Sequence, residues 1–129
     1  MVIKESAENY LEAILMIKKQ KGSVRSIDVA NMLGFSKPSV SVAMKSFREE
    51  GYVTVDHDGD LSLTEKGLKI AKCIYERHEV ISKALIAIGV DEKTAYSDGC
   101  KIEHDISDET FLKLKNHLIA HGVKLEDTI

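Results

Sequence analysis

A cysteine, a glutamate and a histidine follow one another in the C-terminal half of the sequence as Cys100-x-x-Glu103-His104. On a helix, positions i, i+3 and i+4 share a face, so the thiolate, the carboxylate and the imidazole can converge on one ion. Sulfur, oxygen and nitrogen donors together suit a borderline divalent transition metal better than calcium or magnesium. Taken alone, the triplet is more often an exposed Glu-His pair beside a core cysteine.

Polar residues on two other expected helices add to this pattern. His78 falls in an apolar row where leucine or isoleucine is typical, and a buried imidazole needs a hydrogen-bond partner or a metal. Asn9 and Glu12 form a polar row on the first helix, for which plain solvation is the simpler explanation. Because three segments offer polar groups from helices that are expected to pack together, we predict one shared metal site rather than three unrelated features.

Apolar periodicity and capping residues predict the helices that carry these side chains. The first is expected from about residue 6 to residue 21, and a long helix from about residue 65 to residue 88, with Thr64 as its N-cap. Two shorter helices follow, from Asp91 through about Ile106 and from Ser107 through His121. On the first helix, the predicted buried row is Ala7, Tyr10, Leu11 and Ile14. On the long helix, a helix-packing seam is predicted at Ala71, Ile74, His78, Ile81, Leu85 and Ile88.

Between the first and the long helix, the sequence predicts a helix-turn-helix. Two short helices are expected over residues 27–33 and 36–50, with Ser26 and Ser36 as N-caps, and Pro38 lies in the first turn, where a helix tolerates proline. Their expected inward rows are Ile27, Ala30 and Leu33, then Val40, Met44 and Phe47.

Two β-branched runs, residues 52–55 and 61–64, flank the Asp58-Gly59 pair, which favours a tight hairpin. The order of helix, helix-turn-helix and hairpin predicts a mainly α-helical fold. It consists of a winged helix-turn-helix DNA-binding domain over residues 1–71 and a helical domain over residues 72–129.

The second helix of a helix-turn-helix enters the major groove, with its N-terminal residues at the base edges. We expect its serines to reach phosphates or bases, Pro38 to pack on a thymine methyl group, and its basic residues to neutralise the DNA backbone. The alternative is that these small polar residues only cap and solubilise the helix. The predicted DNA-binding residues are Arg25, Ser36, Lys37, Pro38, Ser39, Ser41, Lys45 and Arg48.

The net charge of −3 conceals an uneven distribution. Residues 17–48 carry seven bases and one acid, whereas residues 76–129 carry seven bases and eleven acids, so a local basic face can still meet phosphates. No apolar run approaches the roughly 18 residues that a membrane span requires, and the N-terminus has no signal-peptide pattern. We therefore expect a cytoplasmic protein with no membrane partner.

The combined motifs resemble the DtxR/MntR family of iron- and manganese-dependent repressors. The resemblance covers about residues 4–121 and implies the two-domain form without an SH3-like domain. It also implies that residues 72–129 are the helical dimerisation and metal-binding domain, with metal held where the two domains meet. It is carried by Glu12, the Ser36-Lys37-Pro38-Ser39 helix start, the Leu63–Gly67 stretch, the Arg77-His78 pair and the Cys100-x-x-Glu103-His104 motif.

By this resemblance, Glu12, His78, Glu103 and His104 match ligands of the manganese-sensing branch. Cys100 stands where that branch has a carboxylate and the iron-sensing branch a cysteine. Asn9 stands where the branches use Asp or Met, and its neutral amide oxygen is a poor ligand. We expect one principal site, with room for a second ion beside it as an open alternative, and no iron-branch ancillary site. His57, His117 and His121 are expected outside this site on the surface.

The expected function is a metal-activated transcriptional repressor. Two chains would pair through helices between about residues 72 and 121 and bind a palindromic operator, and metal would fix the angle between their recognition helices. Because Cys100 is a softer ligand than a carboxylate, we favour Fe(II) over Mn(II), with Co(II), Ni(II) or Zn(II) as substitutes in vitro. By resemblance alone, the regulated genes would serve metal uptake.

Two other functions stay open at this point. One is a metal-independent winged-helix regulator that senses a small molecule or only assembles on DNA. The other is a small metalloenzyme, which would need an open coordination position and a general base, and no motif of that kind is present. We therefore expect no enzyme. The operator, the number of ions and the role of Asn9 do not follow from the sequence.

Overall fold

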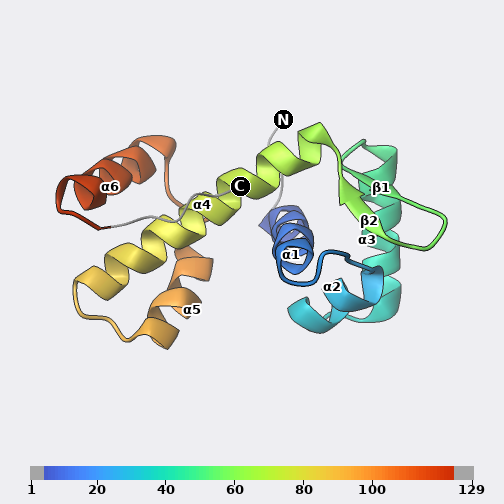
Figure 1. Ribbon diagram of the computed structural model, residues 1–129, viewed down its shortest axis with the longest axis horizontal. Helices are drawn as coiled ribbons and strands as arrows, with labels where there is room; N and C mark the ends of the chain where they lie inside the picture. Colours follow the sequence, from blue (N-terminus) through green and yellow to red (C-terminus); the bar gives the residue numbers. More distant parts are fainter. Residues whose placement is uncertain (1–4, 124–129) are drawn as a thin grey trace. The chain divides into compact units, whose positions relative to one another are not determined.

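The computed structural model describes residues 5–123, and within them the fold is mainly helical, as the sequence predicts (Figure 1). The chain divides into two compact units, Met1–Lys72 and Cys73–Ile129. The elements, in order, are α1 (Glu5–Lys21), α2 (Ser26–Leu33), α3 (Lys37–Glu49), β1 (Val53–Val55), β2 (Leu61–Leu63), α4 (Glu65–Ala87), α5 (Glu92–Ile102) and α6 (Asp108–Ala120).

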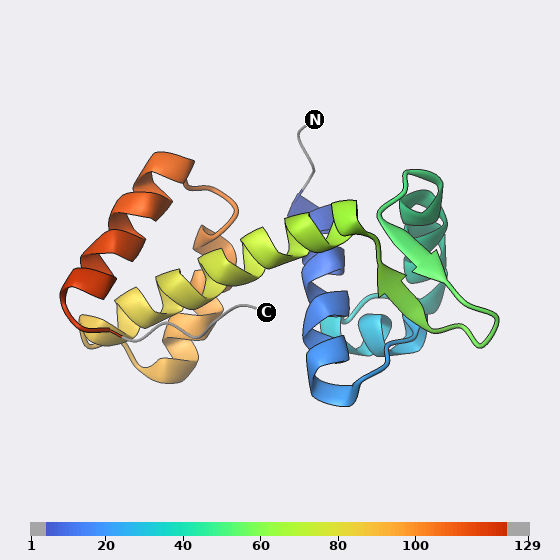
Figure 2. The same cartoon turned by 45° about the horizontal axis from the view of Figure 1, so that its top comes forward.

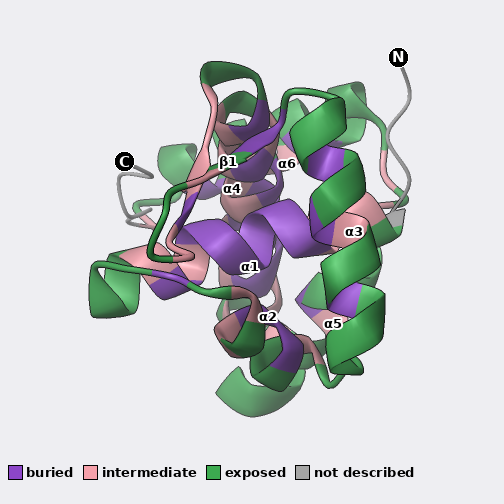
Figure 3. Cartoon of the chain, turned by 90° about the vertical axis from the view of Figure 1, so that its right-hand side faces the viewer, coloured by how far each residue is buried: buried purple, intermediate pink, exposed green. Residues whose placement is uncertain are grey.

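In the first unit, helices α1 to α3 form the helix-turn-helix core. Tyr10 of α1 contacts the rings of Phe35 and Phe47, at 5.4 and 5.5 Å between ring centroids, and Phe47 also meets Tyr52. The predicted row of α3 is confirmed, because Val40, Met44 and Phe47 are all buried. In Figure 3, α1 is mostly buried whereas α3 turns an exposed face outward. This leaves α3 free to present side chains to a partner.

The wing is a two-stranded antiparallel hairpin, and the pair of strands is seen most clearly in Figure 2. Val53 of β1 pairs with Leu63 of β2. It is tied to the helices by the segment before α2. The Leu61 N–H donates to the Val24 carbonyl at 2.8 Å, and the Val24 N–H donates to the Asp60 carboxylate at 2.9 Å. These bonds fix the hairpin against the helix-turn-helix.

Of the five N-caps that the sequence predicts, three are confirmed by side-chain hydrogen bonds, and Asp91 takes the N-cap position of α5 without such a bond. The fifth, at α2, is not confirmed. Ser36, Thr64 and Ser107 each accept a hydrogen bond from the backbone N–H three residues later, and so cap α3, α4 and α6. The prediction for α2 is wrong. Its N-cap is Arg25 rather than Ser26, because the Asp28 carboxylate in the first turn accepts from the Arg25 N–H at 2.9 Å.

The predicted inward row of α2 is also partly wrong. Ala30 is buried as expected, and Val29 joins it, whereas Ile27 is 39% exposed. The buried face therefore lies on the Val29 side of the helix.

The second unit is built from the C-terminal part of α4 together with α5 and α6. Val80 of α4 packs with Phe111 and Leu118 of α6 in an apolar cluster, and His78 of α4 contacts the Tyr96 ring of α5 at 5.6 Å. No helix among residues 5–123 is both long and apolar enough to span a membrane.

Candidate metal centre and DNA-reading face

The second unit brings together three of the predicted metal ligands. Potential ligand atoms of His78, Cys100 and Glu103 all lie within 4.8 Å of one another. His78 Nδ1 lies 2.9 Å from Glu103 Oε2 and 3.6 Å from Cys100 Sγ. His78 comes from α4, Cys100 from α5, and Glu103 from the C-cap of α5. One imidazole thus faces both a thiol and a carboxylate.

Close packing of α5 on α4 sets this arrangement. Gly99 precedes Cys100, and a Cβ atom at Gly99 would lie 2.5 Å from Ser82 Oγ, closer than non-bonded atoms approach. Ser82 is fully buried, one turn after His78 on α4. The missing side chain at Gly99 therefore allows the two helices to approach until His78 and Cys100 meet.

The prediction that helix α5 continues to Ile106 is wrong, since the helix ends at Ile102. Glu103 still donates its N–H to the Gly99 carbonyl at 3.0 Å, so it keeps its place near Cys100, whereas His104 lies in the following turn. The three residues of the motif thus do not share one continuous helical face.

Arg77 holds the segment that follows α5. Its Nη1 donates to the carbonyls of Glu103 at 3.2 Å and Ile106 at 2.8 Å, and its Nη2 pairs with the Asp108 carboxylate. Because Arg77 supplies hydrogen-bond donors to these carbonyls, they do not need a helical partner, which favours the end of α5 at Ile102. Sequence reasoning used Arg77 only as part of a family motif and missed this positioning role.

Charge and hydrogen bonding within the cluster favour a protonated His78. Burial alone would lower the pKa of His78, but hydrogen bonds and charge from Cys100 and Glu103 raise this pKa from 6.5 to about 10. At neutral pH the metal-free site therefore holds an imidazolium beside Cys100 and Glu103. A cation that binds Nδ1 must displace this proton.

The donors fit a borderline divalent transition metal. Bonds to sulfur, nitrogen and oxygen donors are about 2.0–2.3 Å, so neighbouring ligands around one ion lie roughly 3–4 Å apart, close to the spacings found here. Glu103 is 0% exposed, and its Oε1 accepts no well-aligned hydrogen bond from any described residue, although His104 Nε2 lies 3.3 Å away. A fully buried carboxylate of this kind is stabilised by a bound cation.

The remaining predicted ligands are not members of this group of three. His104 contacts the other oxygen of Glu103 but is not within the 4.8 Å cluster. Glu12 is buried on α1 rather than solvated, and Asn9 is half-buried one turn earlier. Both belong to the first unit, so their participation stays a prediction.

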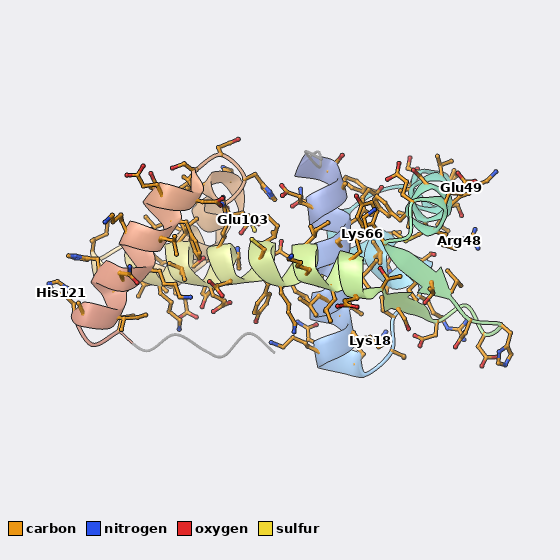
Figure 4. The ribbon with its side chains drawn as sticks, turned by 90° about the horizontal axis from the view of Figure 1, so that it is seen from above. Lys18, Arg48, Glu49, Lys66, Glu103 and His121 are labelled. Carbon is orange, nitrogen blue, oxygen red and sulfur yellow. The ribbon has the colours of Figure 1, made fainter. Side chains whose placement is uncertain are left out.

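On the first unit, the predicted DNA-binding residues share one property. All eight are exposed: Arg25, Ser36, Lys37, Pro38, Ser39, Ser41, Lys45 and Arg48. In Figure 4, Arg48 projects from α3 into solvent. A shallow hollow lined by Ser26, Ile27, Lys37 and Ser41 lies beside the start of α3.

Two lysines of the basic segment have internal partners. Lys18 Nζ donates to the Leu61 carbonyl at 3.3 Å and lies 3.7 Å from the Asp60 carboxylate, and Lys21 Nζ pairs with Asp28 at 2.9 Å. The hydrogen bond from Lys21, together with the one from the Arg25 backbone N–H, holds the pKa of the Asp28 carboxyl below its usual value. The basic surface expected from composition is therefore smaller than the count of lysines indicates.

Sequence reasoning missed Val42 on the recognition helix. Its apolar side chain is 72% exposed, whereas Val40, the other valine of α3, is fully buried. Val42 follows Pro38 by one turn and precedes Lys45 by three residues, so the three share the face opposite Val40 and Phe47. The helical spacing alone could have identified it.

Fold and site together define a class of protein: a winged helix-turn-helix protein with a helical unit that carries metal-binding donors. Comparison with family models gives the family. Residues 3–61 match the N-terminal DNA-binding domain of iron-dependent repressors, and residues 64–120 match their metal-binding and dimerisation domain. The chain belongs to the iron-dependent repressor family, as the resemblance predicted. Members of this family are transcriptional regulators and not enzymes.

Similar proteins cover most of the chain. An uncharacterised HTH-type transcriptional regulator of Methanocaldococcus jannaschii is 37% identical over 113 residues, or 86% of this chain and 90% of its own length. The HTH-type transcriptional regulator MntR of Bacillus subtilis is 37% identical over 102 residues, which cover 79% of this chain and 72% of that protein.

Among solved structures, the metal-dependent transcriptional regulator MtsR is 26% identical, with a TM-score of 0.79 over 88% of this chain. This chain spans 53% of the MtsR chain. A manganese-dependent transcriptional repressor solved with manganese has a TM-score of 0.80 at 24% identity, over 92% of this chain and 53% of its own, which supports the fold.

Proposed function

We propose that the protein is a metal-activated repressor in which a divalent cation bound by His78, Cys100, Glu103 and His104 also engages Glu12 of the DNA-binding domain. The cluster of His78, Cys100 and Glu103 within 4.8 Å is the observation that carries the proposal. An ion that binds both domains stabilises one arrangement of the dimer, and it changes DNA affinity only as far as it prefers that arrangement.

Iron is the proposed physiological metal, with manganese next. Cys100 Sγ is a soft donor, which favours Fe(II), Co(II), Ni(II) and Zn(II) over Mn(II). Glu103 adds a hard oxygen donor that accepts either metal. The similarity to MntR of Bacillus subtilis and to the manganese-bound repressor supports manganese as the alternative physiological metal. The regulated genes would be those for uptake of the sensed metal.

The homodimer is proposed to form through an apolar groove of the second unit. The groove is lined by Ile81, Ala84, Leu85, Ile88, Ile102, Ile106, Thr110 and Leu114. All eight residues fall within the segment that matches the metal-binding and dimerisation domain. Ile88 is 77% exposed there, and an apolar side chain of this kind favours a covered position. Such a dimer would bind a palindromic operator.

The metal switch is tested by DNA binding with and without metal. A high-affinity site is first selected from random duplexes in the presence of Fe(II) or Mn(II), under anaerobic conditions for iron, and its affinity is then measured by fluorescence anisotropy. We expect metal to raise DNA affinity roughly 5–150-fold, the usual size of such coupling. Equal affinity with metal and with chelator would leave a metal-independent winged-helix regulator.

Paired substitutions distinguish the loss of a metal ligand at Cys100 from any general effect of replacing a cysteine. Cys100→Ser should weaken metal activation, whereas Cys73→Ser, the same change at the other exposed cysteine, should leave it intact. Cys100→Glu should shift the metal preference toward Mn(II). A wild type that prefers Mn(II) would contradict the proposal that Cys100 Sγ selects iron.

Glu12→Gln should retain metal binding but lose the gain in DNA affinity. If Glu12→Gln responds to metal as wild type does, the bridging role is wrong.

A further inference from the structure

Two histidines outside the proposed centre lie together on α6. His117 and His121 are four residues apart and therefore share one helical face. Their ring centroids are 4.1 Å apart and the ring planes are inclined by 33°. Both side chains are exposed, and His121 projects outward from the end of the helix (Figure 4). Nothing in the proposed repressor mechanism uses this pair.

A hydrogen bond orients the second imidazole as it does in many metal-binding histidines. His121 Nδ1 lies 2.9 Å from the His117 carbonyl, so Nδ1–H donates to it. In the neutral ring the lone pair is then on Nε2, the nitrogen left to bind a cation. A backbone carbonyl on the other ring nitrogen is a common way to fix the tautomer and direction of a ligating imidazole.

The distance between the rings suits one shared ion. Bonds from an imidazole nitrogen to a transition metal are about 2.0–2.1 Å, so two ligating nitrogens lie within roughly 4 Å of each other. Rings already 4.1 Å apart need only small side-chain rotations to reach this geometry. Water would complete the coordination, since the neighbouring positions on this face, Lys113 and Leu114, offer no carboxylate.

We propose that His117 and His121 form a second cation site that takes Zn(II), Ni(II), Co(II) or Cu(II) and excludes Mn(II). The selectivity follows from the donors. Imidazole suits the later transition metals, whereas Mn(II) prefers carboxylate, carbonyl and water oxygens and stands lowest in the affinity series. Because Lys113 adds positive charge one turn before His117, we expect micromolar rather than tighter binding. This site does not depend on the proposed function.

The two sites differ in what the ion connects. At the proposed centre the donors come from α4, from α5 and from the residue that follows α5. At the second site both donors come from the last turn of α6 and from the residue that caps it. An ion there bridges successive turns of one helix and stabilises its C-terminal end. The pair would therefore report on metals other than the proposed activators without moving one element against another.

The test resolves the two sites by nuclear magnetic resonance. Paramagnetic Ni(II) is titrated into the ¹⁵N-labelled chain of 129 residues, and broadening of backbone amides is followed at residues 117–121 and around His78. We expect broadening at residues 117–121 in the wild type, and at least a roughly tenfold weaker effect there in His121→Asn, which loses the chelate. His57→Asn, the same change at an exposed histidine of the wing, should retain it. The two variants are compared with wild type by circular dichroism to verify that α6 is intact.

Specific outcomes would overturn the site. Amides of residues 117–121 that stay sharp in excess Ni(II), or that broaden equally in His121→Asn, contradict it. Mn(II) should broaden the region of His78 and leave α6 unchanged, so equal broadening of α6 by Mn(II) contradicts the selectivity. If Ni(II) broadens α6 while neither metal affects the region of His78, the second site stands and the proposed function fails.

Discussion

His78 has a strongly raised pKa, and it is the donor that contacts both of the others, Cys100 and Glu103. Since Cys100 and Glu103 raise its pKa from 6.5 to about 10, this imidazole is charged at neutral pH in the absence of metal. Metal binding at Nδ1 requires the neutral ring. We therefore predict release of about one proton per bound ion from this residue, and an apparent affinity that rises as pH increases from about 6 to about 8.

Calorimetric titration in two buffers with different ionisation enthalpies measures this proton release. His57→Asn should behave as wild type, because that residue is exposed on the wing. A metal affinity that is constant over this pH range, with no release of protons, would mean that His78 is not a ligand.

Val42 is predicted to contact a thymine methyl group in the operator. It is 72% exposed on the face of α3 that it shares with Pro38 and Lys45. An apolar contact with the 5-methyl group is one way in which the major groove distinguishes thymine. Burial of one methyl group is worth about 0.8 kcal/mol, so replacing that thymine with uracil should reduce wild-type affinity about fourfold.

The matched variant is Val42→Ala, which should bind the thymine and uracil sites equally. Its fold should be unaffected, since Val42 is exposed. If every thymine of the selected site can be replaced with uracil at no loss of wild-type affinity, the contact does not exist.

Residue types identified the donors, but not how they are held. Cys100 and Glu103 follow from a motif, and His78 stands out as polar in an apolar row. The positioning role of Arg77 could not be predicted in this way, because its carbonyl partners on Glu103 and Ile106 are more than 25 residues away in sequence. Spacing within one helix cannot indicate a hydrogen bond across such a separation.

At the scale of elements, the approach of α5 to α4 sets the geometry of the centre. A Cβ atom at Gly99 would lie 2.5 Å from Ser82 Oγ. Gly99→Ala should therefore push α5 away from α4, at a cost of about 1–3 kcal/mol in the free energy of unfolding, and weaken metal binding. Thermal unfolding and metal titration measure the two effects.

A second substitution tests whether this contact is the cause. Within residues 5–123, Ser82 Oγ is buried with no hydrogen-bond partner, and the next nearest atom of Ser82 is an acceptable 3.6 Å from the added Cβ. Ser82→Ala combined with Gly99→Ala should therefore recover both stability and metal affinity. Alanine in a helix even gains about 0.5–1 kcal/mol over glycine. A double variant as unstable as Gly99→Ala alone would exclude this explanation.

Local signals predicted most elements but not all of their ends. Ser36, Thr64 and Ser107 cap their helices as expected, because each bond joins residues only three positions apart. One end that was wrong depends on a side chain from another helix, and the other depends on a charged side chain within the same first turn. Arg77 of α4 binds the carbonyls after α5, and Asp28 moves the start of α2 to Arg25. Tertiary and charged contacts of this kind override capping preferences.

At the scale of the whole molecule, each recognition helix would read one half of the proposed palindromic operator, so we expect tight binding to require two chains. Among the described residues, the apolar groove of the second unit is a surface suited to pairing, with Ile88 77% exposed at its edge. Its lining comes from α4, from α5, from α6 and from the segment between α5 and α6, so a partner seated there would contact all three helices.

Ile88→Glu is predicted to give a monomer, because a carboxylate in the covered groove would lose its hydration without gaining a partner. Ile119→Glu is the matched control: Ile119 is also exposed, at 55%, on α6, but does not line the groove. Analytical ultracentrifugation measures the state of each variant. Operator affinity of Ile88→Glu should fall roughly 10²-fold or more, since the second half-site no longer binds as part of the same complex. A dimeric Ile88→Glu, or a monomeric Ile119→Glu, would place the interface on a different surface.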